Sequence, residues 1–441
     1  MFCANVRRFI AFRIFFNSRF YYPVFTILFL DFGLTIAQFS ILNAVWAAVI
    51  VLAEVPSGAL ADVVGRKRLL VAASVIMAVE IGIICFAPAG GSPLVFYIFL
   101  ANRILSGLAE AAASGADEAI AYDSLAERGA KKQWGRVLEI LARCQSVGHI
   151  VAMSIGAAIY DPVLMTKAVG FLGINHQFSQ SMTMRFPLYL TFILAILAVL
   201  TTLGMKDVKT STSKKNGKAE SEKASLGQAM GLTLKAGAWI FKTPFALTIL
   251  LFGMMFDGLI RMVITLSSQY YRMIELPESI FGLIGSLVAM LGFVVPKLAR
   301  NIAEKKNPSH ALAVTALLTL TGLVSMNLFL PLAGMIPVML TCCAMYFNGF
   351  FISYYLNQVT ASEQRATVLS FKGLTYNISY GLLGILYALV LKTQRQTVSG
   401  TPNEDLIFMD TFFWFPLTFA VWFVLLMGVT RFIFTQSGIK K

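Results

Sequence analysis

Two long apolar runs are separated by the stretch Gly58-Ala59-Leu60-Ala61-Asp62-Val63-Val64-Gly65-Arg66-Lys67-Arg68-Leu69-Leu70. Gly58 and Gly65 permit tight turning and close backbone approach. Asp62 is suited to face the N-terminus of a helix, and the cluster Arg66-Lys67-Arg68 is typical of the cytoplasmic side of a membrane. The stretch therefore predicts a charged turn at which the chain leaves a membrane and re-enters it.

The composition of the chain agrees with a membrane protein. Its 441 residues are 57% hydrophobic and only 13% charged, whereas a soluble domain carries about 25% charged residues. Apolar runs of about 18 residues or more recur along the chain, and each is long enough to cross a bilayer core of about 30 Å. We expect an all-α polytopic membrane protein with twelve transmembrane helices in two six-helix bundles. The expected helices span residues 9–30, 36–58, 69–87, 94–118, 138–160, 187–205, 243–266, 278–299, 311–331, 333–356, 368–391 and 411–433.

The net charge of +14 is explained by membrane topology and not by a nucleic-acid partner. The expected helices place only a few of the Lys and Arg residues on the side opposite to the termini: Lys167, Arg185, Arg272, Lys392 and Arg395. Three others lie within expected helices, namely Arg19, Arg103 and Arg261. The rest share the side of both termini, which the positive-inside rule places in the cytoplasm. We predict cytoplasmic termini and, because the loops are compact, a bacterial inner membrane.

A basic segment divides the chain in two. Residues 206–242 interrupt the hydrophobic pattern with lysines among Ser, Thr, Asn and Gly, which is typical of a solvated linker. The end of this linker, from Leu226 to Phe241, is amphipathic enough to lie along the membrane surface. The predicted domains are therefore an N-terminal bundle (1–205), the linker (206–242) and a C-terminal bundle (243–441).

Two motifs resemble those of the major facilitator superfamily. The stretch from Gly58 to Leu70 is similar to the loop between the second and third helices of these transporters. Arg103-Ile104-Leu105-Ser106-Gly107 resembles the family's motif in the fourth helix, and Val55-Pro56 and Val295-Pro296 end corresponding helices of the two halves. The resemblance implies a monomeric secondary transporter with a duplicated six-helix unit, which works by alternating access.

Polar side chains are concentrated in four of the expected helices: 9–30, 94–118, 243–266 and 333–356. A charged side chain at mid-membrane costs about 2.5–3.5 kcal/mol on the insertion scale, so each one suggests a cavity, a partner or a function. In the family that this chain resembles, these helices line the central cavity. The resemblance implies the substrate-cavity residues Asn17, Arg19, Tyr22, Arg103, Glu110, Asp257, Arg261, Tyr346, Asn348 and Tyr354. Glu80 does not fit this pattern.

Two groups of charged residues have the spacing of helical neighbours. Arg103, Glu110 and Asp117 are seven residues apart and would stack on one helix face, where an Arg103–Glu110 pair could be structural or functional. Asp257 and Arg261 are four residues apart and can pair directly. This pair is either a lock or a switch in which protonation of the aspartate releases the arginine for an anionic substrate. Because burial favours the neutral form of a carboxyl group, Glu110, Asp117 and Asp257 are the candidates for proton coupling.

The resemblance also implies a conformational latch made of Gly58, Asp62, Gly65, Arg66 and Asp123. In the family, the aspartate of the loop faces the N-terminus of the eleventh helix, and an arginine of the loop pairs with an acid at the end of the fourth helix. These positions correspond to Asp62, Arg66 and Asp123. Such a contact would hold the two halves together in the outward-open state and would not recognise substrate.

The functional prediction is a secondary active transporter of a small organic solute, with protons as the expected coupling ion. The sequence contains no ATP-binding P-loop, so a gradient would supply the energy. The three arginines within helices suit carboxylate or phosphate groups and favour an anionic or zwitterionic solute. Tyrosines and Met-rich helices instead suit a drug, although Gly148–Gly156 lacks the Gly-Pro signature typical of drug–proton antiporters. The alternatives are a proton-driven multidrug antiporter and an uncoupled receptor or lipid-moving protein.

Catalysis is not expected from this sequence. An integral membrane enzyme needs clustered His and Asp or an activated nucleophile near one membrane face. The histidines His149, His176 and His310 are scattered, and the five cysteines are mostly within expected helices. The sequence therefore predicts no catalytic residues, no metal site and no cofactor.

Overall fold

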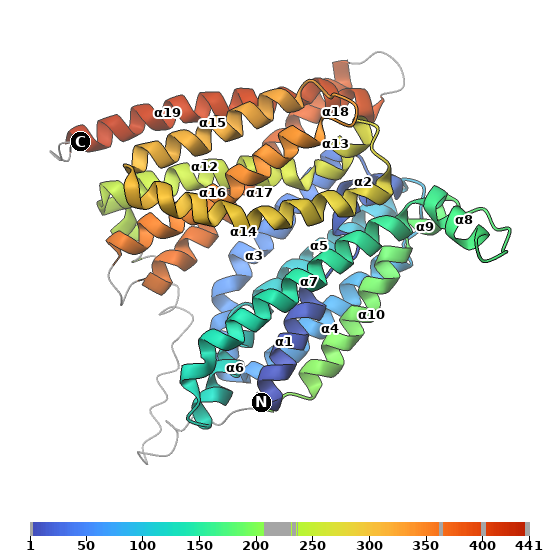
Figure 1. Cartoon of the computed structure of the whole chain (residues 1–441), viewed down its shortest axis with the longest axis horizontal. Coiled ribbons are helices and arrows are strands. Elements are labelled where there is room, and N and C mark those ends of the chain that lie inside the picture. Colours follow the sequence, from blue (N-terminus) through green and yellow to red (C-terminus); the bar gives the residue numbers. More distant parts are fainter. Residues whose placement is uncertain are drawn as a thin grey trace. The chain divides into compact units, whose positions relative to one another are not determined.

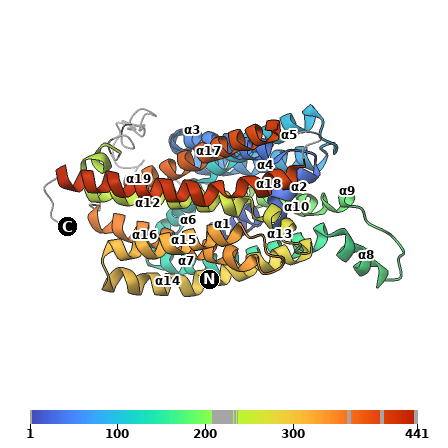
Figure 2. The same ribbon diagram turned by 90° about the horizontal axis from the view of Figure 1, so that it is seen from above.

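The computed structural model describes residues 3–206, 231, 235, 237–360, 365–397 and 403–436. Within these ranges the chain forms helices and connecting segments, with no β-strand, so the predicted all-α fold class is confirmed (Figures 1 and 2). Eleven helical segments of this part of the chain are long and apolar enough to cross a membrane. The protein is therefore an integral, multi-pass membrane protein.

The helices form two compact units. The first unit comprises 1–24, 31–33 and 48–230, and the second comprises 25–30, 34–47 and 231–441. The elements of the N-terminal half are α1 (Ala4–Asn17), η1 (Tyr22–Val24), α2 (Phe25–Asp31), α3 (Ile36–Val64), α4 (Arg66–Cys85), α5 (Pro93–Ala113), α6 (Ala116–Glu127), η2 (Lys131–Gln133), α7 (Trp134–Tyr160), α8 (Pro162–Gly170), α9 (Gln180–Thr183) and α10 (Phe186–Leu203). Those of the C-terminal half are α12 (Pro244–Thr265), α13 (Ser267–Met273), η4 (Glu278–Ile280), α14 (Phe281–Lys305), α15 (Pro308–Met326), α16 (Met335–Val359), α17 (Arg365–Thr397), α18 (Glu404–Phe412) and α19 (Trp414–Gln436).

The helix α2 and the first part of α3 belong to the second unit although they precede its other helices in the sequence. Thr26 explains part of this packing, because its hydroxyl donates a hydrogen bond to the Thr265 carbonyl at the end of α12 (2.5 Å). The backbone amides of Thr26 and Ile27 donate to the Ser268 hydroxyl of α13 (2.9 and 3.2 Å). The predicted domain ranges 1–205 and 243–441 stay a proposal. The expected surface helix from Leu226 to Phe241 lies mostly outside the described residues.

The prediction of one continuous helix over 9–30 is wrong. The first helix ends at Asn17, and a non-helical segment leads to η1 at Tyr22. Pro23 explains the break, because proline disfavours a helical conformation in the residue before it and has no amide hydrogen to donate. The Phe20 amide, freed from the helix, donates to the Thr191 hydroxyl of α10 (3.1 Å). In the membrane, where water is absent, a backbone amide that leaves a helix needs such a hydrogen-bond partner within the protein.

Two glycines of α7 make room for the broken segment. A Cβ atom on Gly156 would lie 1.8 Å from the Phe20 carbonyl oxygen, and a Cβ on Gly148 would lie 2.9 Å from the Ser18 hydroxyl. The clash at Gly156 is with a backbone atom, so only glycine permits this approach there, whereas the atom nearest to Gly148 is the end of a side chain. The sequence Gly148–Gly156 therefore has a packing role in the first unit.

Two further boundaries differ from the prediction. The expected turn at Gly58 is absent, because α3 continues through good helix formers to Val64 and the chain turns only at Gly65, with φ of 98°. The expected helix 94–118 is divided into α5 and α6 by Gly115, whose φ of 75° is left-handed. Residues before and after Gly115 therefore do not share one helix face.

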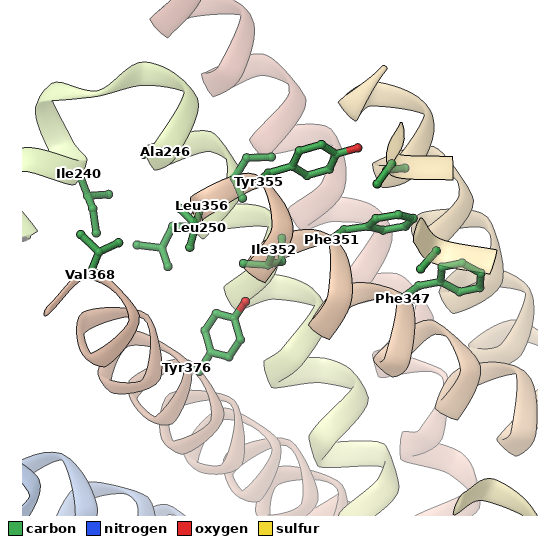
Figure 3. Packing of buried hydrophobic residues seen from close by; sticks show 14 of the residues in the cluster. Ile240, Ala246, Leu250, Phe347, Phe351, Ile352, Tyr355, Leu356, Val368 and Tyr376 are labelled. Carbon is green, nitrogen blue, oxygen red and sulfur yellow. The ribbon is translucent and has the colours of Figure 1, made fainter. Parts of the chain in front are cut away.

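In the second unit α12 is the central helix and contacts α16, α17 and α19. Its core contains Leu250 of α12, Ile352 and Phe351 of α16, and Tyr376 of α17 (Figure 3). Figure 3 shows Tyr376 projecting from α17 toward Ile352. Gly253 of α12 permits this packing, because a Cβ there would lie 2.3 Å from the Tyr376 hydroxyl oxygen. The core thus fixes the mutual positions of three helices that carry polar residues.

We predict that Gly156→Ala destabilises the protein by about 1–3 kcal/mol, the usual cost of overpacking. The added methyl group would collide with the Phe20 carbonyl and push the broken segment away from α7. Thermal unfolding of the purified protein in detergent measures the effect. Gly135→Ala is the matched control in the same helix, because a Cβ at Gly135 meets no atom within 4 Å. Equal stability of the two variants would contradict the packing role of Gly156.

Candidate functional site

A buried polar cluster occupies the first unit and consists of Arg19, Tyr21, Glu80, Asn102 and Arg103. Arg19 lies in the break after α1, and its Nη1 atom donates to Glu80 Oε1 of α4 (2.5 Å) and to the Tyr21 hydroxyl (2.9 Å). Asn102 of α5 donates to the Glu80 carboxylate and to the Glu80 backbone carbonyl (2.9 Å). Arg103 donates to Asn102 Oδ1 through Nε (3.0 Å) and Nη2 (2.9 Å). The five residues therefore form one continuous hydrogen-bonded chain.

This cluster is enclosed by protein. The side chains of Arg19 and Glu80 are 2% and 0% exposed, and Arg103 and Asn102 are buried as well. Isolated buried charges are costly, but they are tolerated when they are paired and their remaining polar atoms are hydrogen-bonded. The cluster contains two buried guanidinium groups and one buried carboxylate, and each of them is hydrogen-bonded within it.

The cluster explains Glu80, which the sequence pattern left without a role. Arg103 belongs to the same cluster through its hydrogen bonds to Asn102, and the expected pair of Arg103 and Glu110 stays a prediction. Glu110 is half-buried and lies on α5 two turns after Arg103. Its role in proton coupling stays a prediction.

Asp117 lies apart from this cluster because the chain breaks at Gly115. It occupies the first turn of α6, where its Oδ1 atom accepts a hydrogen bond from the Glu118 amide (2.7 Å). Its Oδ2 atom pairs with Arg13 Nη1 of α1 (3.1 Å). The expected stack of Arg103, Glu110 and Asp117 on one helix face is therefore wrong, and proton coupling by Asp117 stays a prediction.

One contact of the expected latch is present within the first unit. Arg66, the first residue of α4, forms an ion pair with Asp123 of α6. Gly65 provides the left-handed turn immediately before it. Gly58 and Asp62 lie in α3, but their side-chain positions fall outside the described part of the structure. The role of these residues as a conformational latch stays a proposal.

A second polar cluster lies in the second unit and is built around Asp257 and Arg261 of α12. The two side chains form an ion pair along the helix. Arg261 also donates from Nη1 to Asn377 Oδ1 of α17 (2.9 Å) and lies over the Tyr380 ring, 5.5 Å from its centroid. Lys372 of α17 interacts electrostatically with Asp257. Arg261 is therefore paired directly with the carboxylate, whereas Lys372 lies over the Tyr376 ring, 5.6 Å from its centroid, and acts on Asp257 at longer range.

The three expected cavity residues of α16 do not share one face. Asn348 is buried and donates to the Gly253 carbonyl of α12 (3.5 Å). Tyr346 instead lies against Gly292 of α14, where a Cβ would be 3.3 Å from its ring. Tyr354 stacks on Phe350 at 5.8 Å between ring centroids. Asn348 thus contacts the backbone of α12 directly, while Asn17 and Tyr22 belong to the ends of the broken segment in the other unit.

Sequence reasoning missed several members of these clusters. Lys372, Tyr376 and Tyr380 recur every four residues on α17, and Asn377 is their neighbour. This polar stripe was a usable signal, but Lys372 was counted with the charges on the side of the termini although the expected helix 368–391 contains it. In the structure α17 begins at Arg365, so Lys372 lies two turns inside it. In the part of the chain that the structure describes, no group of His, Cys, Asp or Glu could hold a metal ion.

The comparisons with known proteins place these observations in a family. The sequence matches the model of the Major Facilitator Superfamily over residues 9–384. The chain belongs to this superfamily. A search of curated proteins finds no match. As a member of the superfamily, the protein is a membrane transporter and not an enzyme, and it carries a small-molecule solute.

Solved structures of similar fold support the assignment. The crystal structure of the nucleoside transporter NupG has a TM-score of 0.72 at 13% identity, with 96% of this chain and 98% of that chain covered. A bacterial homolog of the human lysosomal transporter Spinster has a TM-score of 0.68 at 15% identity, covering 97% and 96%. The xylose transporter XylE from E. coli has a TM-score of 0.61 at 11% identity, covering 96% and 98%. At these identities the likeness shows the fold of this superfamily member and no more.

We predict that Arg19 and Glu80 are strongly coupled in stability. Glu80→Leu alone should destabilise the transporter by about 3–5 kcal/mol, because it leaves a buried guanidinium without its counter-charge. The double variant Arg19→Met/Glu80→Leu should recover a large part of this loss. Thermal unfolding of the single and double variants gives the coupling energy.

The exposed pair Glu139–Arg143 of α7 is the control for this measurement, since its side chains are 56% and 77% exposed. Its removal should change stability by less than about 1 kcal/mol. A double variant at Arg19 and Glu80 that loses the full sum of the single effects would contradict the coupling.

Proposed function

We propose that this transporter carries a small organic anion or zwitterion, that transport is coupled to protons, and that Arg261 contacts the anionic group of the solute. The observation that carries the proposal is the excess of positive charge at Asp257. Arg261 and Lys372 both act on this single carboxylate. When an anionic group binds there, it supplies the missing counter-charge.

The accessibility of the two partners supports this assignment. The Asp257 side chain is 6% exposed, whereas that of Arg261 is 28% exposed. The carboxylate is therefore enclosed while the guanidinium reaches the protein surface, where a ligand can contact it. Asn377 and Tyr380 hold the guanidinium from α17. An arginine with a fixed orientation is well suited to bidentate binding of a carboxylate or phosphate.

The same geometry suggests how protons couple to the solute. When Asp257 is protonated, Arg261 and Lys372 lose their negative partner and their attraction for an external anion increases. Thermodynamic linkage makes this effect reciprocal, so a bound anion also favours protonation of Asp257. The pair would then be the switch and not the lock. The remaining expected cavity residues, including Glu110 and Tyr22, stay predictions.

The solved structures of similar fold do not identify the substrate. Their titles name a nucleoside transporter and a xylose transporter among others, so the fold accommodates different solutes. The case for an anion therefore rests on the charged residues of this chain. We further propose cytoplasmic termini, a monomer and a bacterial inner membrane, on the basis of the charge distribution and the short loops.

A thermal-shift screen of the purified protein tests the substrate class. The panel contains organic anions, zwitterions and lipophilic cations. A ligand present at about 100 times its Kd adds about 2.7 kcal/mol of stability, which such a screen detects. Stabilisation by anions or zwitterions is the expected result. Stabilisation by lipophilic cations alone would overturn the proposal and favour multidrug efflux.

We predict that Arg261→Ala abolishes stabilisation by the anionic ligand, and that Asp257→Asn/Arg261→Ala does not restore it. If the ligand fails to stabilise the double variant as well, Arg261 contacts the ligand directly and does more than neutralise Asp257. The matched control is Arg300→Ala, which removes the exposed partner of Glu304 in an i,i+4 pair of α14. Binding that is retained in the double variant would show that Arg261 serves only to balance Asp257.

We predict that Asp257→Asn binds the anion more tightly than the wild type at pH 8 and that its affinity no longer changes with pH. The wild-type affinity should rise as pH falls, because protonation removes the competing carboxylate. Asparagine reproduces the neutral state at every pH. Ligand titrations between about pH 5.5 and 8 measure this effect, because a buried carboxyl group titrates roughly within this range. If the affinity of the variant still depends on pH as that of the wild type does, Asp257 is not the coupling residue.

A further inference from the structure

A basic groove lies on the first unit, where α1 and α10 pack against each other. Its volume is about 440 Å³, and it is lined by Ala4, Arg7, Arg8, Ala11, Leu197, Leu200 and Thr201. The residues of α1 have the spacing i, i+3, i+4 and i+7 and therefore form one stripe of that helix. Small alanines at both ends of the stripe leave the space that the two arginines border.

The groove lies at one end of both helices. Ala4 is the first residue of α1, and Leu203 is the last residue of α10. Figure 1 shows the start of the chain, marked N, beside this end of α10. Because α10 is part of a segment long and apolar enough to cross a membrane, and α1 packs against it, we place this end of both helices at the depth of the lipid headgroups. Charge distribution predicts that this is the cytoplasmic side.

Within the described residues, the two arginines of the groove have no carboxylate partner. Neither Arg7 nor Arg8 forms an ion pair with any residue that the structure describes. Arg13, farther along the same helix, is by contrast paired with Asp117 and Glu118. Arg8 is held close to α10, because a Cβ on Gly204 would lie 2.9 Å from its Nε atom. Two adjacent guanidinium groups therefore border the groove with no carboxylate of the described chain against them.

The side of the groove formed by α10 is apolar and exposed. Leu200 is 60% exposed, and Leu197 and Leu203 are exposed as well. This arrangement suits a ligand with an anionic head and a hydrocarbon tail. A soluble anion would contact the arginines but gain nothing from the leucines.

We propose that this groove binds an anionic phospholipid, with the phosphate on Arg7 and Arg8 and an acyl chain along Leu197 and Leu200. Arginine pairs with phosphate through two parallel hydrogen bonds. Basic pockets between helices at the membrane surface are suited to anionic lipid headgroups. The site is independent of the proposed solute site, because all its residues belong to the first unit.

The test uses the full-length protein in detergent, titrated with phosphatidylglycerol or with phosphatidylcholine of the same acyl chains. Native mass spectrometry counts the bound lipids. Phosphatidylglycerol should bind preferentially, and Arg7→Gln/Arg8→Gln should weaken its binding about tenfold. Arg128→Gln, which removes an exposed arginine of the loop after α6, is the matched control and should bind as the wild type does. Glycerol 3-phosphate, which has the charge but no acyl chain, should not compete.

A second variant keeps the arginines and moves only one of them. Gly204 has helical backbone angles, so alanine is tolerated there, and its methyl group displaces the Arg8 side chain. Gly204→Ala should therefore weaken phosphatidylglycerol binding without lowering the melting temperature.

Unchanged lipid affinity in both variants, or an equal loss in Arg128→Gln, would overturn the proposal. Competition by glycerol 3-phosphate would instead identify a site for soluble phosphate. Solute-induced thermal shifts in the same variants separate this result from the fate of the transport proposal.

Discussion

The buried ion pair between Arg19 and Glu80 is the interaction on which the first unit depends. Arg19 can reach Glu80 because α1 stops at Asn17 and the backbone leaves the helix. The break is possible because Thr191 accepts the freed Phe20 amide and because Gly156 leaves space for the Phe20 carbonyl. In hydrocarbon each of these polar groups needs a partner inside the protein. The pair, the break and the glycine are therefore one interdependent arrangement.

Hydropathy and charge were sufficient to predict the all-α class and the approximate position of most helices, because both follow from the thickness of the bilayer. They could not predict the break near Arg19, since a window average does not report which backbone groups find partners. Pro23 was a local signal for it. The role of Glu80 could not be read from the sequence, because its partners Arg19 and Asn102 come from two other elements.

The candidate site of the second unit could be predicted only in part, again because some of its residues come from different helices. Asp257 and Arg261 are neighbours on one helix, so their contact followed from spacing alone. Lys372 and Asn377 contribute from a different helix, and their approach depends on the packing of α17 against α12. Tyr376 shows how close this packing is, because only a glycine at position 253 leaves room for its hydroxyl. Pairing within a helix is predictable from sequence, whereas pairing between helices depends on such contacts.

The two clusters differ in a way that bears on their functions. Arg19 is enclosed, and its partners occupy fixed positions on α4 and in the segment before η1, so exchange of a partner would leave a buried charge uncompensated. Arg261 reaches the surface and shares Asp257 with Lys372, so it can change partners without losing solvation entirely. A rigid element and an exchangeable one are both needed by a transporter that alternates between states. The charged residues of the first unit are suited to the former role, and those of the second unit to the latter.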